Sequence, residues 1–268
     1  MDKMKKVLIL GASGMLGSMV DDYLSKKKDI DVTAMEDRNS KVDFRGYDYI
    51  INCIGIIKQK MRTTEEVIRV NSLLPYQILR LKKPETKVIQ IATDCVFSGD
   101  KGKYIETDIH DAGDAYAKTK SLGEIEEFYN IRTSIIGPHK KSKVSLLEWF
   151  LSQKKGATIK GYTNHYWNGI TTLHFAKLCY AIIKNNYELP SDLHIVPADI
   201  VSKYRLLKII AKEYKREDIQ ITKHKDIKID RSLSSLRTSW NKKLWKAMDY
   251  DSSPTIDQMV KELAKYGN

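Results

Sequence analysis

The chain begins with a pattern that few folds accommodate: a short apolar run, a glycine-rich loop and an amphipathic segment. Residues 6–10 form a β-branched and leucine run, which favours a buried strand. The loop GASGMLG follows, and residues 15–27 place apolar side chains at helical intervals. Because Gly11, Gly14 and Gly17 permit a sharp turn, backbone N–H groups at the helix start can approach a pyrophosphate. The loop predicts a dinucleotide site, with a glycine turn that serves packing alone as the alternative.

Strands and helices alternate through the first half of the sequence. Further strands are predicted at residues 31–35, 49–54, 88–92 and 132–136, and helices at 64–81 and 116–129. Pro75 should kink or interrupt the first of these helices. Residues 36–47 leave little room for a crossover helix, so we expect an irregular segment there. The alternation predicts an α/β fold, a Rossmann-type doubly wound parallel sheet with ligands beyond the carboxyl ends of its strands.

After Pro138 the pattern changes to shorter elements. Helices are predicted at residues 146–151, 172–183, 203–213 and 255–266, an aromatic and polar loop at 162–170, and strands at 194–196 and 219–222. The strand at 194–196 can return to the main sheet. We therefore expect a Rossmann domain over residues 1–160, with a returning segment near 170–200, and a smaller C-terminal α/β lobe over 161–268 that mainly binds substrate.

The composition predicts a globular protein with a basic surface. The chain has 268 residues, 42% of them hydrophobic and 30% charged, and a formal net charge of +12. Its lysines are scattered in short clusters and accompany no recognised nucleic-acid module, so we expect no nucleic-acid partner. A basic cleft could still draw in small polyanions such as nucleotides.

Other features of the sequence predict a cytoplasmic protein without a metal site or a membrane partner. The three cysteines show neither metal-ligand spacing nor a disulfide framework. No later apolar run approaches membrane-spanning length. The start MDKMKKVLIL has the basic residues and apolar stretch of a signal peptide. This stretch is short, lacks a cleavage-like site and continues into the glycine loop, so we interpret it as the first strand.

The run YAKTK places a lysine four residues after a tyrosine. A phenol has an ordinary pKa near ~10, so it needs a neighbouring cation to work as an acid or base near neutral pH. If residues 116–124 are helical, Tyr116 and Lys120 lie on one face, and Lys120 can be that cation. Thr93, at the end of a predicted strand, can hold a substrate carbonyl oxygen. Alternatively, Tyr116 is an aromatic residue at a helix start, Lys120 is a solvated lysine and Thr93 is a hydroxyl at a strand end.

Charged residues follow the second predicted strand, where the ribose of a dinucleotide would lie. An acidic side chain there favours the free 2′-hydroxyl of NAD, and an arginine favours the 2′-phosphate of NADP. Asp37 and Arg38 offer both, with a charged surface turn as the alternative. Asp43 and Phe44 could hold the adenine edge and face, and residues 52–55 form a small turn suited to cofactor approach.

Several motifs occur together in one order and spacing. They are GASGMLG, Asn71 in VNSLLPYQIL, Thr93-Asp94 followed by Val96-Phe97 and Gly99, then Tyr104, Glu106 and Asp108, Tyr116 with Lys120, and Arg231 in DRSLSSL. With this set the chain resembles the extended short-chain dehydrogenases/reductases, and among them the dTDP-4-dehydrorhamnose reductase-like, sugar nucleotide-binding family. The resemblance covers nearly the whole chain.

The resemblance implies a reductase site. Tyr116 would give a proton to a sugar carbonyl as NAD(P)H delivers hydride, Lys120 would lower the phenol's pKa and hold the nicotinamide ribose, and Thr93 would orient the carbonyl. The implied cofactor is NADP, with NAD as the alternative. Together with Tyr116 and Lys120, the residues expected to bind it are Gly11, Ser13, Gly14, Met15, Leu16, Gly17, Asp37, Arg38, Asp43, Phe44, Cys53, Ile54, Gly55, Asn71, Ala92, Gly137 and Pro138.

The loop GYTNHYWNG is unlike the typical rhamnose reductase and suggests a different sugar nucleotide. It combines hydrogen-bonding groups with a flat ring suited to a sugar or base face, unless it is a structural turn with a packed tryptophan. Arg231 could clamp a diphosphate bidentately or be structural. The residues expected to bind substrate are Thr93, Asp94, Cys95, Asn164, His165, Trp167, Asn168 and Arg231.

These motifs predict an NAD(P)H-dependent reductase of a nucleotide-activated 4-keto-6-deoxy sugar, for surface polysaccharide or glycan synthesis. A sugar-nucleotide epimerase or dehydratase that uses bound NAD(P) transiently would have the same site. The dehydratases need an extra acid and base, and Cys95 does not look like the glutamate that would follow Asp94 in them. A non-catalytic nucleotide-binding regulatory subunit is the third alternative, against which the three catalytic groups argue. The chain is also expected to be able to form a homodimer.

Overall fold

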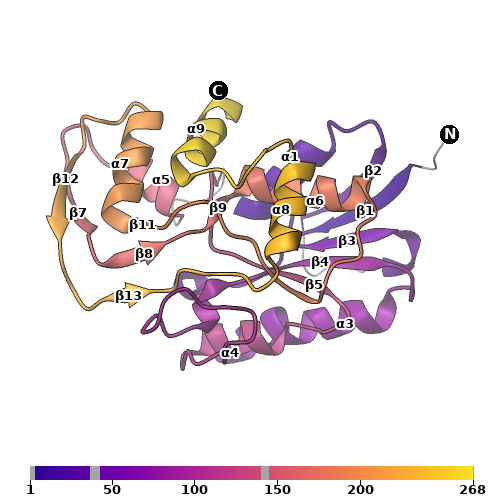
Figure 1. Cartoon of the computed structure of the whole chain (residues 1–268). Helices are drawn as coiled ribbons and strands as arrows, with labels where there is room; N and C mark the ends of the chain where they lie inside the picture. The colour runs from indigo at the N-terminus through magenta and orange to yellow at the C-terminus, as the bar shows by residue number, and fades with distance from the viewer. Residues whose placement is uncertain (1–3, 37–42, 140–144, 268) are drawn as a thin grey trace.

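The computed structural model of the protein describes residues 4–36, 43–139 and 145–267. Its centre is a six-stranded sheet with parallel pairings in the order β10-β5-β4-β3-β1-β2 (Figure 1). The strands are β1 (Lys5–Leu10), β2 (Ile30–Met35), β3 (Tyr49–Asn52), β4 (Lys87–Ala92), β5 (Tyr129–Arg132) and β10 (Asp192–His194). Because β2 and β3 flank β1 on opposite sides, the winding reverses at β1. The predicted Rossmann-type doubly wound parallel sheet is confirmed.

Helices cover both faces of this sheet (Figure 1). On one face α1 (Met15–Leu24) packs against α6 (Thr172–Lys184). On the other lie α3 (Leu74–Leu81) and α4 (Ala115–Leu122). The main sheet is therefore the middle layer of three.

Side chains alternate along β1 between two apolar cores. Val7 and Ile9 belong to the larger core, which includes α1 and α6. Leu8 and Leu10 point the other way and join a second core with Ile78 of α3. Since both faces of a parallel sheet are buried in this way, residues that bind ligands are left to the strand ends.

The predicted helix at residues 64–81 is interrupted, as Pro75 indicated. It forms α2 (Thr64–Ile68), one π-helical turn (Arg69–Leu73) and then α3. Proline has no N–H to donate and its ring crowds the preceding turn, so a wider turn ahead of it avoids a clash. Asn71 lies in this turn and is buried.

The end predicted for the following helix is wrong. α4 ends at Leu122 instead of near residue 129, and Gly123 caps it. A Cβ at Gly123 would fall 2.0 Å from the Asn71 carbonyl oxygen, so the chain here lies against the π-helical turn. This contact lets the chain leave the helix early and enter β5.

The strand predicted at residues 132–136 is also displaced. β5 ends at Arg132, and only β6 (Ile135–Ile136) remains of the predicted segment, paired with β9 (Ile170–Thr171) instead of the main sheet. The start of β5 is not evident from the sequence, because it buries Asn130, whose polar side chain is not typical of a buried strand.

A row of buried amides joins β3, β4 and β5 to the end of α4. Gln90 of β4 accepts a hydrogen bond from Asn52 at 2.9 Å and donates one to Asn130 at 3.0 Å. Its amide nitrogen also donates to the Gly123 carbonyl at 2.7 Å. The sheet is thereby tied to the helix that carries Tyr116, through buried polar groups that are paired with one another.

A smaller group of elements lies beside one end of the main sheet (Figure 1). It contains α5 (Leu146–Leu151), β7 (Thr158–Tyr162), β8 (His165–Trp167), β11 (Val201–Ser202), α7 (Lys203–Glu213), β12 (Gln220–His224), β13 (Ile229–Asp230) and α9 (Ile256–Tyr266). β7 pairs with β12, and β8 is the middle strand of a three-stranded sheet with β11 and β13. The predicted loop at 162–170 therefore contains a strand. Its pairing partners come from distant parts of the chain, so the local sequence does not indicate it. α8 (Thr238–Ala247), which packs against α6, is not among the predicted helices.

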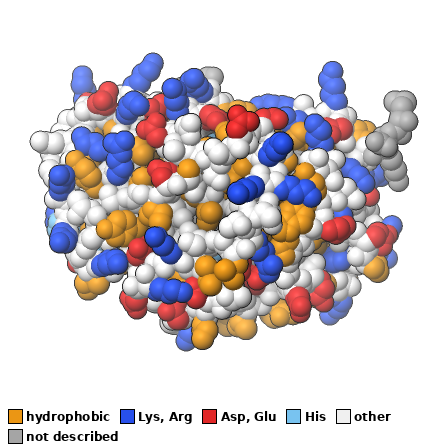
Figure 2. Space-filling model, viewed as in Figure 1, with side chains coloured by type: hydrophobic (Ala, Val, Ile, Leu, Met, Phe, Trp, Pro, Cys, Tyr) orange, Lys and Arg blue, Asp and Glu red, His pale blue; other side chains and the backbone are white. Residues whose placement is uncertain are grey.

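The surface agrees with the scattered lysines of the sequence. Figure 2 shows Lys and Arg side chains spread over the visible face, among acidic and apolar groups. No helix within the described ranges is both long and apolar enough to cross a membrane.

Gln90→Leu should lower the free energy of unfolding by about 2–4 kcal/mol, because leucine leaves the buried asparagines and the end of α4 without their partner. Urea denaturation followed by circular dichroism measures this change. Gln77→Leu is the matched control: Gln77 is exposed on α3, so its effect should stay within about 0.5 kcal/mol. Equal effects of the two substitutions would contradict the role given to the amide row.

Candidate active site

The glycine loop lies where the winding of the sheet reverses. It follows β1, and residues 53–55 follow the neighbouring β3, so both segments lie at the carboxyl edge of the sheet. Gly11 has a φ of +82°, and a Cβ there would fall 2.9 Å from Cγ1 of Ile54. A Cβ at Gly17 would fall 2.1 Å from the Gly11 carbonyl oxygen. The turn therefore requires these glycines, and no side-chain cap occupies the N–H groups at the start of α1.

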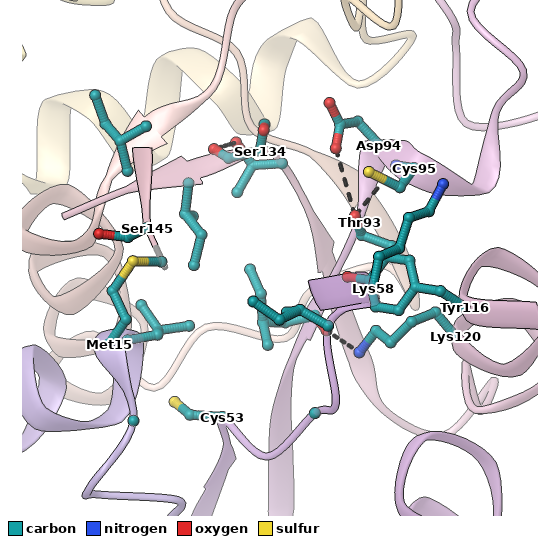
Figure 3. Close-up of a pocket in the computed structure, with 18 of the residues that line it drawn as sticks. Met15, Cys53, Lys58, Thr93, Asp94, Cys95, Tyr116, Lys120, Ser134 and Ser145 are labelled. Atoms are coloured by element: carbon teal, nitrogen blue, oxygen red, sulfur yellow. Dashed lines mark hydrogen bonds between the residues drawn. The ribbon is translucent and has the colours of Figure 1, made fainter. Parts of the chain in front are cut away.

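Two adjoining cavities open along this edge. The first, of about 750 Å³, lies between the glycine loop and the segment after β3, and we call it the glycine-loop cavity. The second, of about 370 Å³, is bordered by Thr93 and Tyr116, and we call it the tyrosine cavity (Figure 3). Gly14, Gln59, Lys60 and residues 53–55 line both cavities. The two form one cleft for an extended ligand that begins at a helix N-terminus.

Thr93, Tyr116 and Lys120 line the tyrosine cavity together (Figure 3). Thr93 follows β4, and its hydroxyl accepts a hydrogen bond from the Cys95 N–H at 3.1 Å. Asp114 caps α4 through its carboxylate and so fixes the turn from which Tyr116 projects. The sequence therefore identified three side chains that the fold brings to one wall.

Burial dominates the electrostatics of these groups. It raises the pKa of Tyr116 well above its ordinary value of 10.0, and a hydrogen bond with Thr93 opposes this only in part. The Lys120 ammonium donates to the Ile91 carbonyl at 2.9 Å, and burial lowers the pKa of Lys120 to about 8. The Tyr116 phenol therefore stays protonated at neutral pH, and a strand carbonyl holds the Lys120 cation. The expectation that Lys120 lowers the Tyr116 pKa stays a prediction.

Most residues predicted to bind a cofactor lie along the cleft. Its lining includes Gly11, Ser13, Gly14, Met15, Leu16, Cys53, Ile54, Gly55 and Ala92. Asn71 lies behind the lining, where it accepts a hydrogen bond from the Ile56 N–H at 2.8 Å and donates to the Ile56 carbonyl at 3.1 Å. Asn71 thereby fixes the segment after β3 on which the cleft is built.

Two predicted adenine contacts lie elsewhere. Phe44 is 7% exposed and packs in the core that includes α3, so its ring has no free face for a base. Asp43 forms an ion pair with Arg45 at 2.8 Å. The ribose-reading residues Asp37 and Arg38 lie outside the described residues.

The two residues predicted to flank the nicotinamide follow the cavity wall but do not line it. Gly137 is buried, and a Cβ there would fall 2.1 Å from the Thr172 hydroxyl oxygen. Pro138 follows Gly137. The residues on either side of this pair, Ile136 and His139, do line the tyrosine cavity. The close approach of Gly137 to α6 therefore sets the path of this wall.

Among the residues predicted to bind substrate, Asp94 and Cys95 line the tyrosine cavity beside Thr93. Burial raises the pKa of Asp94, and the cations of Lys203 and Arg231 oppose this shift. Arg231 does not line the cavity, and its Nε donates to a backbone carbonyl at 2.7 Å. A buried carboxyl group with two cations near it therefore lies next to the wall that carries Thr93.

The loop predicted to read the substrate packs away from the cavity. Trp167 is 2% exposed and belongs to the larger apolar core. Asn164 and Asn168 each exchange hydrogen bonds with the backbone of residues 226–233, and the His165 ring donates to the Ile227 carbonyl at 3.0 Å. Because β8 is the middle strand of its sheet, these side chains join it to the chain around β13 and have no contact with the cleft.

Several lining residues were not predicted from the sequence. They are Lys58, Gln59, Lys60, Ser134, His139 and Ser145. Lys58 forms an ion pair at 2.7 Å with Asp114, the cap of α4. The basic run KQKMR, in the segment that follows β3, is the signal that could have identified the two lysines. Within the described part of the chain, no group of three or more His, Cys, Asp or Glu side chains could hold a metal ion.

The fold and the cleft define a Rossmann-type α/β protein with a Thr-Tyr-Lys set on one wall of its cavity. Residues 4–239 match the family described as "RmlD substrate binding domain", and the chain belongs to this family. The match confirms the resemblance that the motifs indicated. Comparison with curated protein sequences gives no significant match.

Solved structures of similar fold include reductases and an epimerase. The dTDP-4-dehydrorhamnose reductase of Clostridium acetobutylicum is 20% identical, with a TM-score of 0.74, and the match covers 97% of this chain and 99% of that one. The Bacillus anthracis dTDP-4-dehydrorhamnose reductase, in complex with NADP, is 14% identical over 98% and 99%, with a TM-score of 0.76. The Bacillus cereus UDP-glucuronic acid 4-epimerase, in complex with NAD, is 15% identical over 97% and 99%, with a TM-score of 0.72. At these identities the likeness establishes the fold.

Gly17→Ala should weaken NADPH binding about tenfold or more, a loss of ~1.4 kcal/mol or greater, because its methyl group must displace the Gly11 carbonyl from the turn. Titration of NADPH fluorescence measures the affinity, and circular dichroism checks the fold. Gly46→Ala is the control, since nothing lies within 4 Å of a Cβ there. Unchanged affinity in a folded Gly17→Ala protein would show that the loop does not hold the cofactor.

Proposed function

We propose that the protein is an NAD(P)H-dependent reductase of a nucleotide-activated 4-keto-6-deoxy sugar. The observation that carries this proposal is the position of Thr93, Tyr116 and Lys120 on one wall of a cavity that continues into the cleft at the glycine loop. Membership of the "RmlD substrate binding domain" family supports it, as does the reductase activity named for two proteins of similar fold.

The residues present fit a dinucleotide. A side chain at Gly11 or Gly17 would fill the turn at the start of α1, where a pyrophosphate would receive backbone N–H groups. Lys60 and Arg62, from the basic run after β3, line the glycine-loop cavity and add positive charge for phosphates. We propose NADP as the cofactor, since the Bacillus anthracis reductase was crystallised with it, and NAD as the alternative.

The wall of the tyrosine cavity can supply the proton of a carbonyl reduction. The nicotinamide supplies the hydride when the cofactor is bound. Because burial keeps the Tyr116 phenol protonated, it can donate its proton to the substrate oxygen as negative charge develops there. Thr93 can hold the same oxygen with its hydroxyl. The Lys120 cation, charged below a pH of about 8, favours the phenolate that proton transfer leaves behind.

The substrate side of the site is proposed from charge and position. Residues 1–160 with the returning segment near 170–200 would hold the cofactor, and the lobe over 161–268 would mainly hold the substrate. Lys58, between the cofactor cleft and the start of α4, would bind an anionic group of the substrate in place of Asp114. The three cysteines are free thiols, which supports a cytoplasmic location. A homodimer stays a prediction from the sequence.

Tyr116→Phe should leave NADPH affinity nearly unchanged and lower turnover by ~10²-fold or more, because it removes a positioned proton donor. NADPH oxidation with a panel of keto sugar nucleotides measures turnover. Tyr129→Phe is the control, since the Tyr129 hydroxyl donates to Glu188 at 2.6 Å and lies outside both cavities. Full turnover in the Tyr116→Phe protein would contradict the proposed function.

Lys58→Met should weaken the binding of a nucleotide diphosphate sugar about fivefold, an amount equal to ~1 kcal/mol for a half-exposed charge contact. Thermal shift with dTDP-, UDP-, GDP- and CDP-sugars measures this, because a ligand that binds only the folded state raises its apparent stability. Lys118→Met is the control, since Lys118 is exposed on α4 and lines neither cavity. Equal binding by both variants would contradict the substrate contact.

An epimerase or dehydratase that uses NAD(P) transiently is the second candidate. The observation that favours a dehydratase is Asp94, a buried carboxyl group beside Thr93 that could be the extra acid, and burial raises its pKa. Stoichiometric consumption of NADPH separates net reduction from epimerisation. A chain that binds NADPH and oxidises none with any keto sugar would instead favour the non-catalytic regulatory subunit.

A further inference from the structure

A buried cluster behind the tyrosine cavity takes no part in the proposed chemistry. Its centre is Arg132, at the end of β5, which is 4% exposed. The guanidinium contacts both oxygens of Glu124, at 2.9 and 2.5 Å, and also donates to the Thr93 carbonyl at 2.9 Å. Its remaining N–H groups donate to Nε2 of His194 at 3.1 Å and to Nε2 of His110 at 2.9 Å. All five guanidinium donors are therefore in use.

This cluster connects the elements that carry the predicted catalytic residues. Thr93 is the residue after β4, and Glu124 lies one helical turn beyond Lys120, just past the end of α4. Burying an ion pair removes two charges from water and contributes little net stability, so stability alone does not account for the cluster. A bidentate arginine does fix geometry, because its planar fork allows few arrangements.

We propose that Arg132 and Glu124 are positioning residues of the reductase site. They clamp the backbone at Thr93 to the end of α4, so that the Thr93 hydroxyl and the Lys120 ammonium keep a constant separation on the cavity wall. This inference rests on the proposed function. Arg132 and Glu124 line neither cavity and act through the residues that do.

The charges of the cluster also affect the pKa of Lys120. This effect separates a cluster that stays intact after mutation from one that loosens and admits water. Burial is the main cause of the low Lys120 pKa of about 8; the Glu124 carboxylate raises this pKa, and the Arg132 cation lowers it. Burial and Arg132 lower the pKa of both His110 and His194, so these rings are neutral above pH 7. They therefore do not change charge while Lys120 titrates.

Removing each partner from an intact cluster should move the Lys120 titration in opposite directions. Glu124→Gln removes the anion and lowers the midpoint below about 8, whereas Arg132→Gln removes the cation and raises it. A cluster that only loosens on mutation admits water, which moves the midpoint up toward the ordinary 10.5 in both variants.

The titration is measured by NMR of the Lys Cε resonances in the full-length, ligand-free protein with ¹³C-labelled lysine, assigned with Lys120→Arg. Shifts of opposite sign support the proposal, and shifts of the same sign, or no shift, overturn it. If Arg132→Gln does not fold, Glu124→Gln decides alone: a lower midpoint supports the proposal, and an equal or higher one overturns it. Glu262→Gln is the control, because Glu262, like Glu124, pairs with a basic side chain, here Lys177, and it lies outside both cavities.

Kinetics give the second measurement. Glu124→Gln should lower kcat on the order of 10-fold to 10²-fold with little change in NADPH affinity, because small displacements of reacting groups cost rate more than binding. The fall in its kcat/KM above pH ~8 should also begin at a lower pH than in the natural protein, since kcat/KM follows the ionisation of the free enzyme. An unchanged kcat in Glu124→Gln overturns the positioning role. An inactive natural protein contradicts the proposed reductase instead, and the NMR titration still decides whether the cluster controls Lys120.

Discussion

The central parallel sheet is buried on both faces, and this constraint determines where the protein can place its chemistry. With α1 and α6 on one side and α3 and α4 on the other, the inner strands β3, β4 and β5 expose little but their ends. The carboxyl ends of β1 and β3 meet where the winding reverses, and those of β4 and β5 lie next to them. The glycine loop, Thr93 and the start of α4 are therefore neighbours although they are far apart in sequence.

Much of this arrangement follows from local patterns in the sequence. Thr93, Tyr116 and Lys120 could be identified because a strand end and an i,i+4 pair on a helix place side chains by backbone geometry alone. The glycine loop is equally local, since Gly11 and Gly17 are required within a single turn. These positions need no knowledge of distant parts of the chain.

Other features depend on partners that the sequence does not mark. Trp167 has the chemistry of a sugar-binding residue, but β8 pairs with β11 and β13, and this pairing buries its ring. The start of β5 contains Asn130, which a buried strand accepts only because Gln90 and backbone carbonyls satisfy its amide. The pKa of Tyr116 depends in the same way on burial by distant parts of the chain. Residue type sets what a side chain can do, and distant packing decides which of these roles it takes.

The buried amide row and the arginine cluster both end just past the C-terminus of α4, at Gly123 and Glu124. The opposite end of α4 is held at the surface, where Lys58 pairs with its capping residue Asp114. The helix is thus held by buried polar groups at one end and by a surface ion pair at the other, two residues before Tyr116. Changes at Lys58 and its neighbours can alter which ligand the cleft accepts without disturbing the buried polar groups that hold the sheet. A scaffold with this asymmetry can diversify its substrates while its hydride and proton chemistry stays the same.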